Sequence, residues 1–518
     1  MKTGRLRART VGWSLAGVGA IVAAFALGAR IGAERARAQD TWREGRLLSE
    51  AIDSVRVNAL DALPNDELIR RAVSGMLREL HDPYARLLRP DSYQSYRGML
   101  LGESQGLGLA LRLQGALLSV RRVADGSPAA AAGVRRGDRI LEWNGVAMSA
   151  WRTRTAADST RLQADTAQLL LWRPPFGDSV RVTVPRATWH TPAVSDAGML
   201  TDSVGYVRLS SISQRASQEL ESSVAALARR GARALVLDLR GNGGGLFEEG
   251  VKAAALFLPH AAVVASLASR DAAPQVYRAE RSRWPALPLT VLVDAGTASA
   301  AEVLAAALRE HGRGLLVGAP TYGKGVVQRV VRLSPDLSLR LTTARWLTPS
   351  GRALQRRTGT DDSATGGLEP DVRLDEPSWR DPSGVPRDWS ARTAAAVVAA
   401  ADSVSMHALR EGWATSPVSL LESRLSVRVA TLVPRTVTGE ASRARWVSVA
   451  TRLATVRMLE VEAQYETLLR YGMREDAAIR AGLDVLAPGS DAMQVLPTVL
   501  PTASSIASPS VSPAAPRE

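Results

Sequence analysis

The sequence predicts an α/β fold, more fully an α+β multidomain chain. It has a βαβ-type core, an inserted β-rich module, N-terminal helices and a C-terminal helical extension. Apolar runs typical of buried strands alternate with helix-forming runs from residue 203 to 375. Residues 99–187 contain short strand-like runs separated by glycine turns. Residues 389–486 are rich in alanine and arginine, which favour helices. A length of 518 residues suits about three domains.

Composition excludes several classes of function. The net charge is +14, but the basic residues are scattered, without a long basic run or a zinc-finger spacing, so we expect no nucleic-acid partner. The same net positive charge would favour contact with an anionic membrane surface. The chain lacks cysteine, which excludes disulfides, cysteine-bound metals and a thiol nucleophile. Its five histidines match no zinc motif, so we expect neither a metal nor a cofactor.

Residues 1–40 form an anchor or targeting segment. Four basic residues precede Val11–Ala29, a 19-residue stretch without charge that is long enough to span a bilayer as a helix. A cleaved signal peptide ending near Ala36-Arg37-Ala38 is the alternative, and a buried soluble helix is the third interpretation. Either exported interpretation places the remaining chain outside the cytoplasm, with the membrane contacted through residues 11–29.

The next two regions differ in their patterns. Residues 41–98 are predicted to be helical, with a break near Pro64. Residues 99–187 form the β-rich module, in which a Gly106-Leu107-Gly108-Leu109 loop precedes an alternating strand. Asn144-Gly145 predicts a tight hairpin turn later in the module.

This order of elements resembles a PDZ domain, most specifically through the segment SPAAAAGVRRGDRILEWNG. The resemblance implies that Gly106, Leu107, Gly108 and Leu109 form a carboxylate-binding loop. Such loops present backbone N–H groups to the C-terminus of a peptide and add that peptide to the sheet as a strand. A β module without a ligand is the alternative.

Residues 188–375 form the predicted core, and its first half contains a glycine turn. A buried strand, Ala234–Leu239, runs into Arg240-Gly241-Asn242-Gly243-Gly244-Gly245 and then into a helix. Backbone N–H groups at such a turn suit an anion or a developing oxyanion. A phosphate-binding loop is excluded because the sequence lacks G-x-x-x-x-G-K-[ST].

The second half of the core contains the candidate nucleophile. An apolar strand, Leu289–Asp294, is followed by a turn, by Ser299 and by the helix-forming run Ala300–Glu310. A serine at a helix N-terminus lies where the helix dipole and free N–H groups stabilise negative charge, which suits a nucleophile whose attack creates an oxyanion. An ordinary N-cap serine is the alternative.

Lys324 is the candidate base. The chain has three lysines, Lys2, Lys252 and Lys324, and all its other basic residues are arginine. Only a lysine can lose its proton when burial lowers its pKa, so a lysine kept between Gly323 and Gly325 is a candidate proton acceptor for Ser299. A loop lysine without a role is the alternative. His311 follows Ser299 by 12 residues on the same helix, about 18 Å away at 1.5 Å per residue, so it is not the base.

The final parts carry no motif. Residues 376–486 are predicted to form a helical C-terminal extension. Residues 487–518 are rich in Pro, Ser and Ala and are predicted to be a disordered tail.

Residues 45–375 resemble the C-terminal processing peptidases, serine proteases with an embedded PDZ domain. The resemblance implies that Ser299 is the nucleophile, Lys324 the general base and Gln328 a residue that helps to position the lysine. It also implies an oxyanion hole formed by the N–H groups of Ala300 and Gly244, with Gly245 as neighbour. The matching segments are ELIRRAVSGMLRELHDPYARLL, VGYVRLSSIS, ALVLDLRGNGGGLF, VLVDAGTASAAEVLAAALREHGRGLLVG, TYGKGVVQ, LTTARWLTPSGR and GLEPDV.

Three positions depart from the family pattern: Ala301 stands where serine is common, Glu310 where aspartate is expected and Gly243 where proline is usual. None removes the nucleophile or the base. We therefore expect an exported serine endopeptidase that binds protein substrates by their accessible C-termini and cleaves unstructured or tagged proteins. The alternative is a non-catalytic PDZ-type scaffold or adaptor of the cell envelope. The sequence leaves open whether the protein forms a homo-oligomer.

Overall fold

The computed structural model describes residues 44–61, 63–114, 117–148, 165–173, 178–270, 272–356, 366–374, 389–413, 416–461, 467, 470 and 476–487. The predicted anchor at residues 11–29 and the predicted tail beyond residue 487 lie outside this set. Within it, every helix is too short or too polar to cross a bilayer. The described residues fall into two compact units. The first unit contains the described residues up to Arg89 together with Val330–Leu341. The second unit contains the described residues of Pro90–Arg329 and those from Thr342 onward.

The first unit is mainly helical. One helix spans residues 44–58 and α2 spans Asn65–Glu79, on either side of the break that the sequence predicts near Pro64. β1 (Arg86–Leu88) then pairs antiparallel with the first residues of β18 (Leu337–Leu347). Several apolar side chains of the two helices are exposed, among them Leu47, Val57 and Met76.

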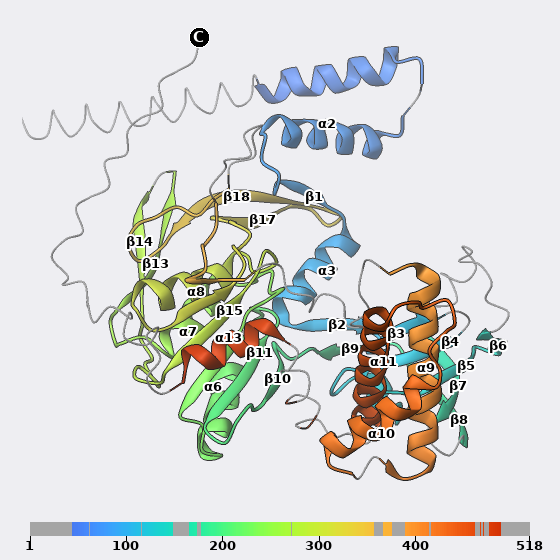
Figure 1. The fold of residues 1–518 in the computed structure, drawn as a ribbon. Helices are drawn as coiled ribbons and strands as arrows, with labels where there is room; N and C mark the ends of the chain where they lie inside the picture. The colour runs from blue at the N-terminus through green and yellow to red at the C-terminus, as the bar shows by residue number, and fades with distance from the viewer. Residues whose placement is uncertain are drawn as a thin grey trace, which may run out of the picture. The chain divides into compact units, whose positions relative to one another are not determined.

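The core of the second unit is a six-stranded sheet with the order β10-β11-β12-β15-β16-β19 (Figure 1). β10 pairs antiparallel with β11, and the other neighbours are parallel. Parallel neighbours need crossover connections, and helices α6 (Ala216–Arg229), α7 (Phe247–Ala255) and α8 (Ala300–Glu310) lie within them. The strands are β10 (Val194–Met199), β11 (Val204–Leu209), β12 (Ala234–Asp238), β15 (Leu289–Val293), β16 (Leu315–Gly318) and β19 (Val372–Arg373).

Both faces of this sheet are buried. Successive side chains of a strand point to opposite faces, and β12 shows this alternation. Leu235 and Leu237 join the hydrophobic cluster that contains α6, α7 and α8. Val236 joins a second cluster that contains residues of α13 (Ala477–Val485). Figure 1 shows α13, in red, lying over the sheet, and its contacts are with β12, β15 and β16.

A second sheet carries the segment that follows Lys324. Its order is β1-β18-β13-β14, and β17 (Val326–Ser334) pairs with β18. β13 (Val263–Ser269) pairs with the last residues of β18, Ala344–Leu347. β14 spans Ala272–Arg278. β17 begins two residues after Lys324, so the lysine lies directly before this strand.

The inserted module is a sheet with the order β3-β4-β5-β7-β8, with β6 paired to β5. It packs around Trp143, Leu169 and Leu171. Asn144 and Gly145 have φ of 50° and 76° and form the predicted hairpin turn. A two-stranded ladder, β2 with β9, pairs the residues on either side of the module. The strands are β2 (Glu103–Gly106), β3 (Leu109–Gln114), β4 (Leu117–Val123), β5 (Arg139–Trp143), β6 (Val146–Ala147), β7 (Thr166–Arg173), β8 (Asp178–Pro185) and β9 (Ala187–His190).

The C-terminal region is helical. Helices α9 (Ala391–Arg410), α10 (Val418–Ala430) and α11 (Glu440–Val461) pack around the buried Trp446. Helix α13 does not join their hydrophobic cluster, and its apolar side chains pack against the six-stranded sheet. The C-terminal region therefore contributes to two separate cores.

Candidate active site

Ser299 lies in a strained turn between β15 and α8. Its φ is 56° and its ψ is −120°, a combination that residues other than glycine rarely adopt. Ser299 precedes the first helical residue and is only partly buried. The N–H of Ala300 belongs to the first turn of α8, where a helix offers no acceptor of its own. The turn thus presents a hydroxyl next to a helix N-terminus.

Glu302 connects the Ser299 turn to the Lys324 loop. Its side chain is fully buried, and its Oε2 accepts hydrogen bonds from the Ser299 N–H at 2.8 Å and from the Lys324 N–H at 2.9 Å. The two nitrogens are therefore at most 5.7 Å apart. Oε1 accepts from the Thr321 hydroxyl at 2.6 Å and from the Gly323 N–H at 2.8 Å. One carboxylate thus holds the backbone of both candidate catalytic residues.

The protonation of Glu302 is set by opposing effects. Burial raises the pKa of its carboxyl above the ordinary value of 4.5, although the hydrogen bonds from Thr321 and from three backbone N–H groups oppose this shift. All four partners donate, and the ionised carboxylate only accepts. The geometry therefore matches the ionised form, and protonation would remove an acceptor site.

The Lys324 loop is packed too tightly for side chains on either flank. A Cβ at Gly323, where φ is 85°, would lie 2.8 Å from the Gly367 nitrogen. A Cβ at Gly325 would lie 2.6 Å from the Gln355 nitrogen. The Lys324 carbonyl accepts a hydrogen bond from the buried Trp346 Nε1 at 2.9 Å. Both glycines are therefore required for this close packing.

Gln328 lies on β17, four residues after Lys324, and is partly buried. Its Nε2 is buried and donates to no acceptor among the described residues. A buried donor without a partner is unfavourable, so this amide can take a further hydrogen-bond partner.

The glycine turn contacts the Ser299 turn directly. A Cβ at Gly244 would lie 2.5 Å from the Ala298 carbonyl oxygen, 2.8 Å from the Ala300 nitrogen and 2.9 Å from the Ser299 Cβ. The Gly244 N–H donates to Asn242 Oδ1 at 2.9 Å in this structure. A Cβ at Gly245 would lie 2.2 Å from the Ile212 carbonyl oxygen. Among the described residues, no heavy atom beyond the two chain neighbours lies within 4 Å of a Cβ position at Gly243.

Buried polar residues hold the start of this turn. The Gly241 N–H donates to Asp294 Oδ1 at 2.8 Å, and Asn242 Nδ2 donates to the Leu209 carbonyl at 2.8 Å. Asp238 accepts from the buried Arg240 side chain and backbone. Burial alone would raise the pKa of Asp238, but the Arg240 guanidinium pulls it below its ordinary value.

His311, Glu310 and Lys252 each make a hydrogen bond or an ion pair away from Ser299. His311 ends α8, and its Nε2 lies 2.7 Å from the Val263 carbonyl oxygen, to which it donates. Glu310 accepts a hydrogen bond from the Ser350 N–H at 2.8 Å. Lys252 is exposed and pairs with Glu249 at 2.9 Å. The described part of the protein holds no group of three or more His, Asp or Glu side chains that could bind a metal.

Sequence reasoning missed Glu302, Asp294 and the Asp238–Arg240 pair. For Glu302 a signal was present: serine followed three residues later by glutamate is the pattern of a capping box, in which the glutamate accepts from the N-cap N–H. Here that carboxylate also reaches the Lys324 loop. The contact of Asp294 with Gly241 joins segments 53 residues apart and had no local signal. Asp238 and Arg240 are only two residues apart, but the sequence carried no motif for their pairing.

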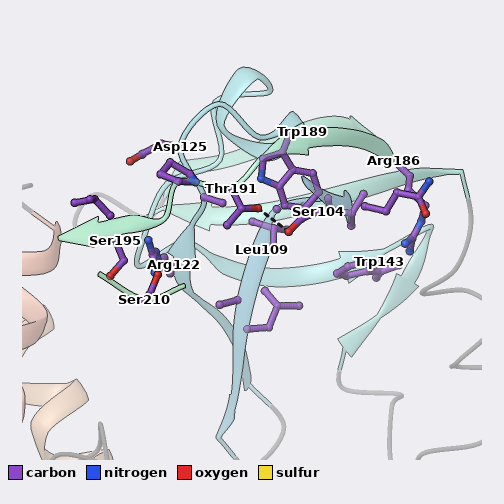
Figure 2. A pocket seen from close by; sticks show the side chains of 18 residues that line it. Ser104, Leu109, Arg122, Asp125, Trp143, Arg186, Trp189, Thr191, Ser195 and Ser210 are labelled. Atoms are coloured by element: carbon purple, nitrogen blue, oxygen red, sulfur yellow. Dashed lines mark hydrogen bonds between the residues drawn. The ribbon is translucent and has the colours of Figure 1, made fainter. Parts of the chain in front are cut away.

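The predicted carboxylate loop lines a cavity of about 490 Å³, where Figure 2 shows Leu109, Arg186 and Trp189 among the lining side chains. Gly106 and Gly108 have φ of 141° and 82°. A Cβ at Gly108 would lie 2.1 Å from the Ser127 Cβ, so only glycine fits. The carbonyls of Leu107 and Gly108 accept from the Ala129 and Ala124 N–H groups, so both are already hydrogen-bonded within the module.

Comparison with known proteins gives two family matches. Residues 203–374 match the model of peptidase family S41, and residues 119–172 match that of the PDZ domain. A carboxyl-terminal-processing protease from Picosynechococcus is 37% identical over 283 residues, covering 54% of this chain and 68% of that protein. The carboxy-terminal processing protease CtpA of Bacillus subtilis is 28% identical over 333 residues, covering 64% and 69%. A solved photosystem II D1 C-terminal processing protease is 32% identical, with a TM-score of 0.39, over 62% of this chain and 86% of that protein.

Proposed function

This chain belongs to the family of C-terminal processing serine proteases that carry a PDZ domain, and we propose that Ser299 is its nucleophile and Lys324 its general base. The observation that carries this assignment is the shared carboxylate. Glu302 Oε2 accepts from the N–H groups of both residues, so their backbones are held together at the N-terminus of α8. A serine and a base within reach of each other are what acyl-enzyme catalysis requires.

In the proposed reaction, Ser299 Oγ attacks a peptide carbonyl carbon while Lys324 Nζ takes the hydroxyl proton. The negative charge that develops on the substrate oxygen is stabilised by the Ala300 N–H and by the glycine turn. Gly244 reaches that oxygen only if its N–H leaves Asn242 Oδ1, with Gly245 as the neighbouring donor. Lys324 then protonates the leaving amine, and water hydrolyses the acyl-enzyme. The free Gln328 Nε2 would help to position the lysine.

Substrate C-termini would bind at the loop Gly106-Leu107-Gly108-Leu109. β3 is an edge strand of its sheet, so an extended peptide can pair with it. The Arg186 guanidinium lies 3.6 Å from the Cβ position of Gly106, which places positive charge beside the loop. Two further cavity residues, Trp143 and Trp189, have buried indole N–H groups without an acceptor among the described residues. Donors of this kind suit a carboxylate.

The proposal extends to location and organisation. Residues 11–29 would anchor the protein, or target it for export, and place the catalytic part outside the cytoplasm. Residues 99–187 would form the PDZ domain and residues 188–375 the protease core. N-terminal sequencing of the mature protein tests the anchor, because a protein that begins near residue 39 would show cleavage instead.

One experiment tests the catalytic assignment. The full-length protein and Ser299→Ala are each incubated with a fluorophosphonate probe, which labels activated serines, and with an unfolded protein that has an apolar C-terminus. We expect labelling and cleavage by the parent alone, with C-terminal peptide binding by both. Labelling or cleavage by Ser299→Ala would reject Ser299 as the nucleophile. Binding by both proteins with cleavage by neither would favour the scaffold function.

We expect Glu302→Gln to lower kcat by about 10- to 100-fold. An amide cannot accept from all four donors, and each hydrogen bond to the charged carboxylate that is lost removes about 1.5–3 kcal/mol. In the parent, kcat should fall as acidification through the raised pKa of Glu302, above 4.5, protonates the carboxylate. The pH profile of kcat for parent and variant measures both effects.

Protonation of Glu302 should lower the activity at acid pH without unfolding the protein. A carboxyl whose pKa is raised in the folded state binds its proton more tightly there than in the unfolded state. Its contribution to stability is therefore greatest below its unfolded pKa, near 4.5, and is lost as the pH rises through the folded value. A Glu302→Gln variant that keeps the parent kcat at neutral pH would contradict the role given to Glu302.

A further inference from the structure

Helix α13 lies outside the S41 match, which ends at residue 374, yet it buries one face of the protease sheet. Its buried Ile479 and Val485 cluster with Val236, Leu292 and Val317 of the central strands. The Thr290 hydroxyl on β15 donates to the Gly482 carbonyl at 3.3 Å. A Cβ at Gly482 would lie 3.2 Å from the Thr290 Cγ2, so the helix and the sheet are in close contact.

Asp476 links this helix to the candidate active site. It is the N-cap of α13 and accepts from the Ala478 N–H at 3.0 Å and the Ile479 N–H at 3.2 Å. Arg240 Nη1 donates to the same carboxylate and lies 3.0 Å from its Oδ1 and 2.9 Å from its Oδ2. On its other side Arg240 donates to Asp238, from Nε at 2.9 Å and from Nη2 at 2.6 Å. One buried guanidinium is thus held between two carboxylates.

Arg240 directly precedes the glycine turn. Its side chain is 1% exposed, and its own N–H donates to Asp238 Oδ1 at 2.9 Å. The next residue, Gly241, donates to Asp294. Because the turn then contacts Ser299 through Gly244, a shift of the Arg240 side chain would be passed to the oxyanion donors. A buried guanidinium that loses one of its partners is strongly destabilised and tends to move.

We propose that Asp476 is a positioning residue for the oxyanion turn, and that α13 is therefore part of the catalytic unit and not of a separate extension. This inference rests on the proposed function, since it assigns Asp476 a role toward the same turn. Asp476 acts through Arg240 and touches no substrate. Its contribution should appear when the oxyanion forms and not when the substrate binds, so it should affect kcat more than KM.

The test compares Asp476→Asn with Asp484→Asn in the full-length protein. Asparagine is as good an N-cap as aspartate, so the first variant keeps α13 capped while removing the charge opposite Arg240. Asp484 lies on the same helix and is exposed, which makes it the matched control for loss of charge. We expect kcat to fall about 10-fold, or about 1.4 kcal/mol, in Asp476→Asn alone. KM should stay near that of the parent. The thermal midpoint should fall in Asp476→Asn, because a buried ion pair loses one charge, so kcat is measured well below that midpoint and per mole of folded protein.

A second readout reports the oxyanion site directly. A peptide boronic acid forms a tetrahedral adduct with an active serine, and its affinity should fall by the same factor as kcat. Asp476→Ser, which caps the helix but is too short to reach Arg240, should reproduce the loss. A parent-like kcat in either variant, a loss confined to KM, or an equal loss in Asp484→Asn would overturn the role of Asp476.

Ser299→Ala is measured in parallel. If it still cleaves, the proposed function fails, and the role of Asp476 fails with it. If Ser299→Ala is inactive while Asp476→Asn is fully active, the catalytic assignment stands and only the positioning role is rejected.

Discussion

Lys324→Arg is expected to fold and to lose proteolysis by about 10²- to 10⁴-fold, the range that a general base contributes. The guanidinium keeps its proton at any pH a protein tolerates, so it cannot take the proton of Ser299. The loop should survive the change, since its geometry depends on backbone contacts, among them the Lys324 N–H to Glu302 and the Lys324 carbonyl to Trp346. The measurement is kcat on an unfolded protein substrate, with near-ultraviolet circular dichroism to confirm the fold.

Lys252→Arg is the matched control. Lys252 on α7 is exposed, pairs with the buried carboxylate of Glu249, and offers the same change of side chain away from Ser299. It should keep the parent kcat, because an arginine stays charged and can form the same ion pair. Appreciable proteolysis by Lys324→Arg would exclude the Ser–Lys mechanism. An equal loss in Lys252→Arg would point to a general effect on folding.

The catalytic turn could be predicted because its signals are local. A five-residue apolar strand, a turn, a serine and a run of helix formers stand next to one another in the sequence, and the structure has β15, Ser299 and α8 in that order. Lys324 was conspicuous because lysine is rare in this protein. The carboxylate that joins them was not predicted, since Glu302 contacts residues 19 to 22 positions away as well as Ser299.

The role of α13 was missed, although the strands contained a signal for it. In the sequence, β12 and β15 are almost continuous apolar runs, ALVLD and LTVLV, which is the pattern of strands covered on both faces. Helices α6, α7 and α8 pack in one hydrophobic cluster, on one face. The sequence therefore indicated that something had to cover the other face. It contained no information on which segment that was, because the covering helix follows β15 by almost 200 residues.

Gly244→Ala is expected to lower kcat by about 10²- to 10³-fold, the effect of losing one oxyanion donor. The added Cβ would lie 2.8 Å from the Ala300 nitrogen and 2.9 Å from the Ser299 Cβ, and the φ of 86° is unfavourable for alanine. The clash separates the glycine turn from the nucleophile, so both N–H donors are displaced from the position that the oxyanion takes. Because this change acts on the transition state, KM should change little.

Gly243→Ala provides the comparison within the same turn. A Cβ at Gly243 would have no described heavy atom within 4 Å other than those of its chain neighbours, and the residue is exposed. Gly243→Ala should therefore keep kcat within about twofold of the parent, as surface substitutions usually stay within about 0.5 kcal/mol. If both variants lose activity equally, flexibility of the whole turn, and not its contact with Ser299, would be what catalysis requires. If Gly244→Ala stays active, the oxyanion must be stabilised by Ala300 without the glycine turn.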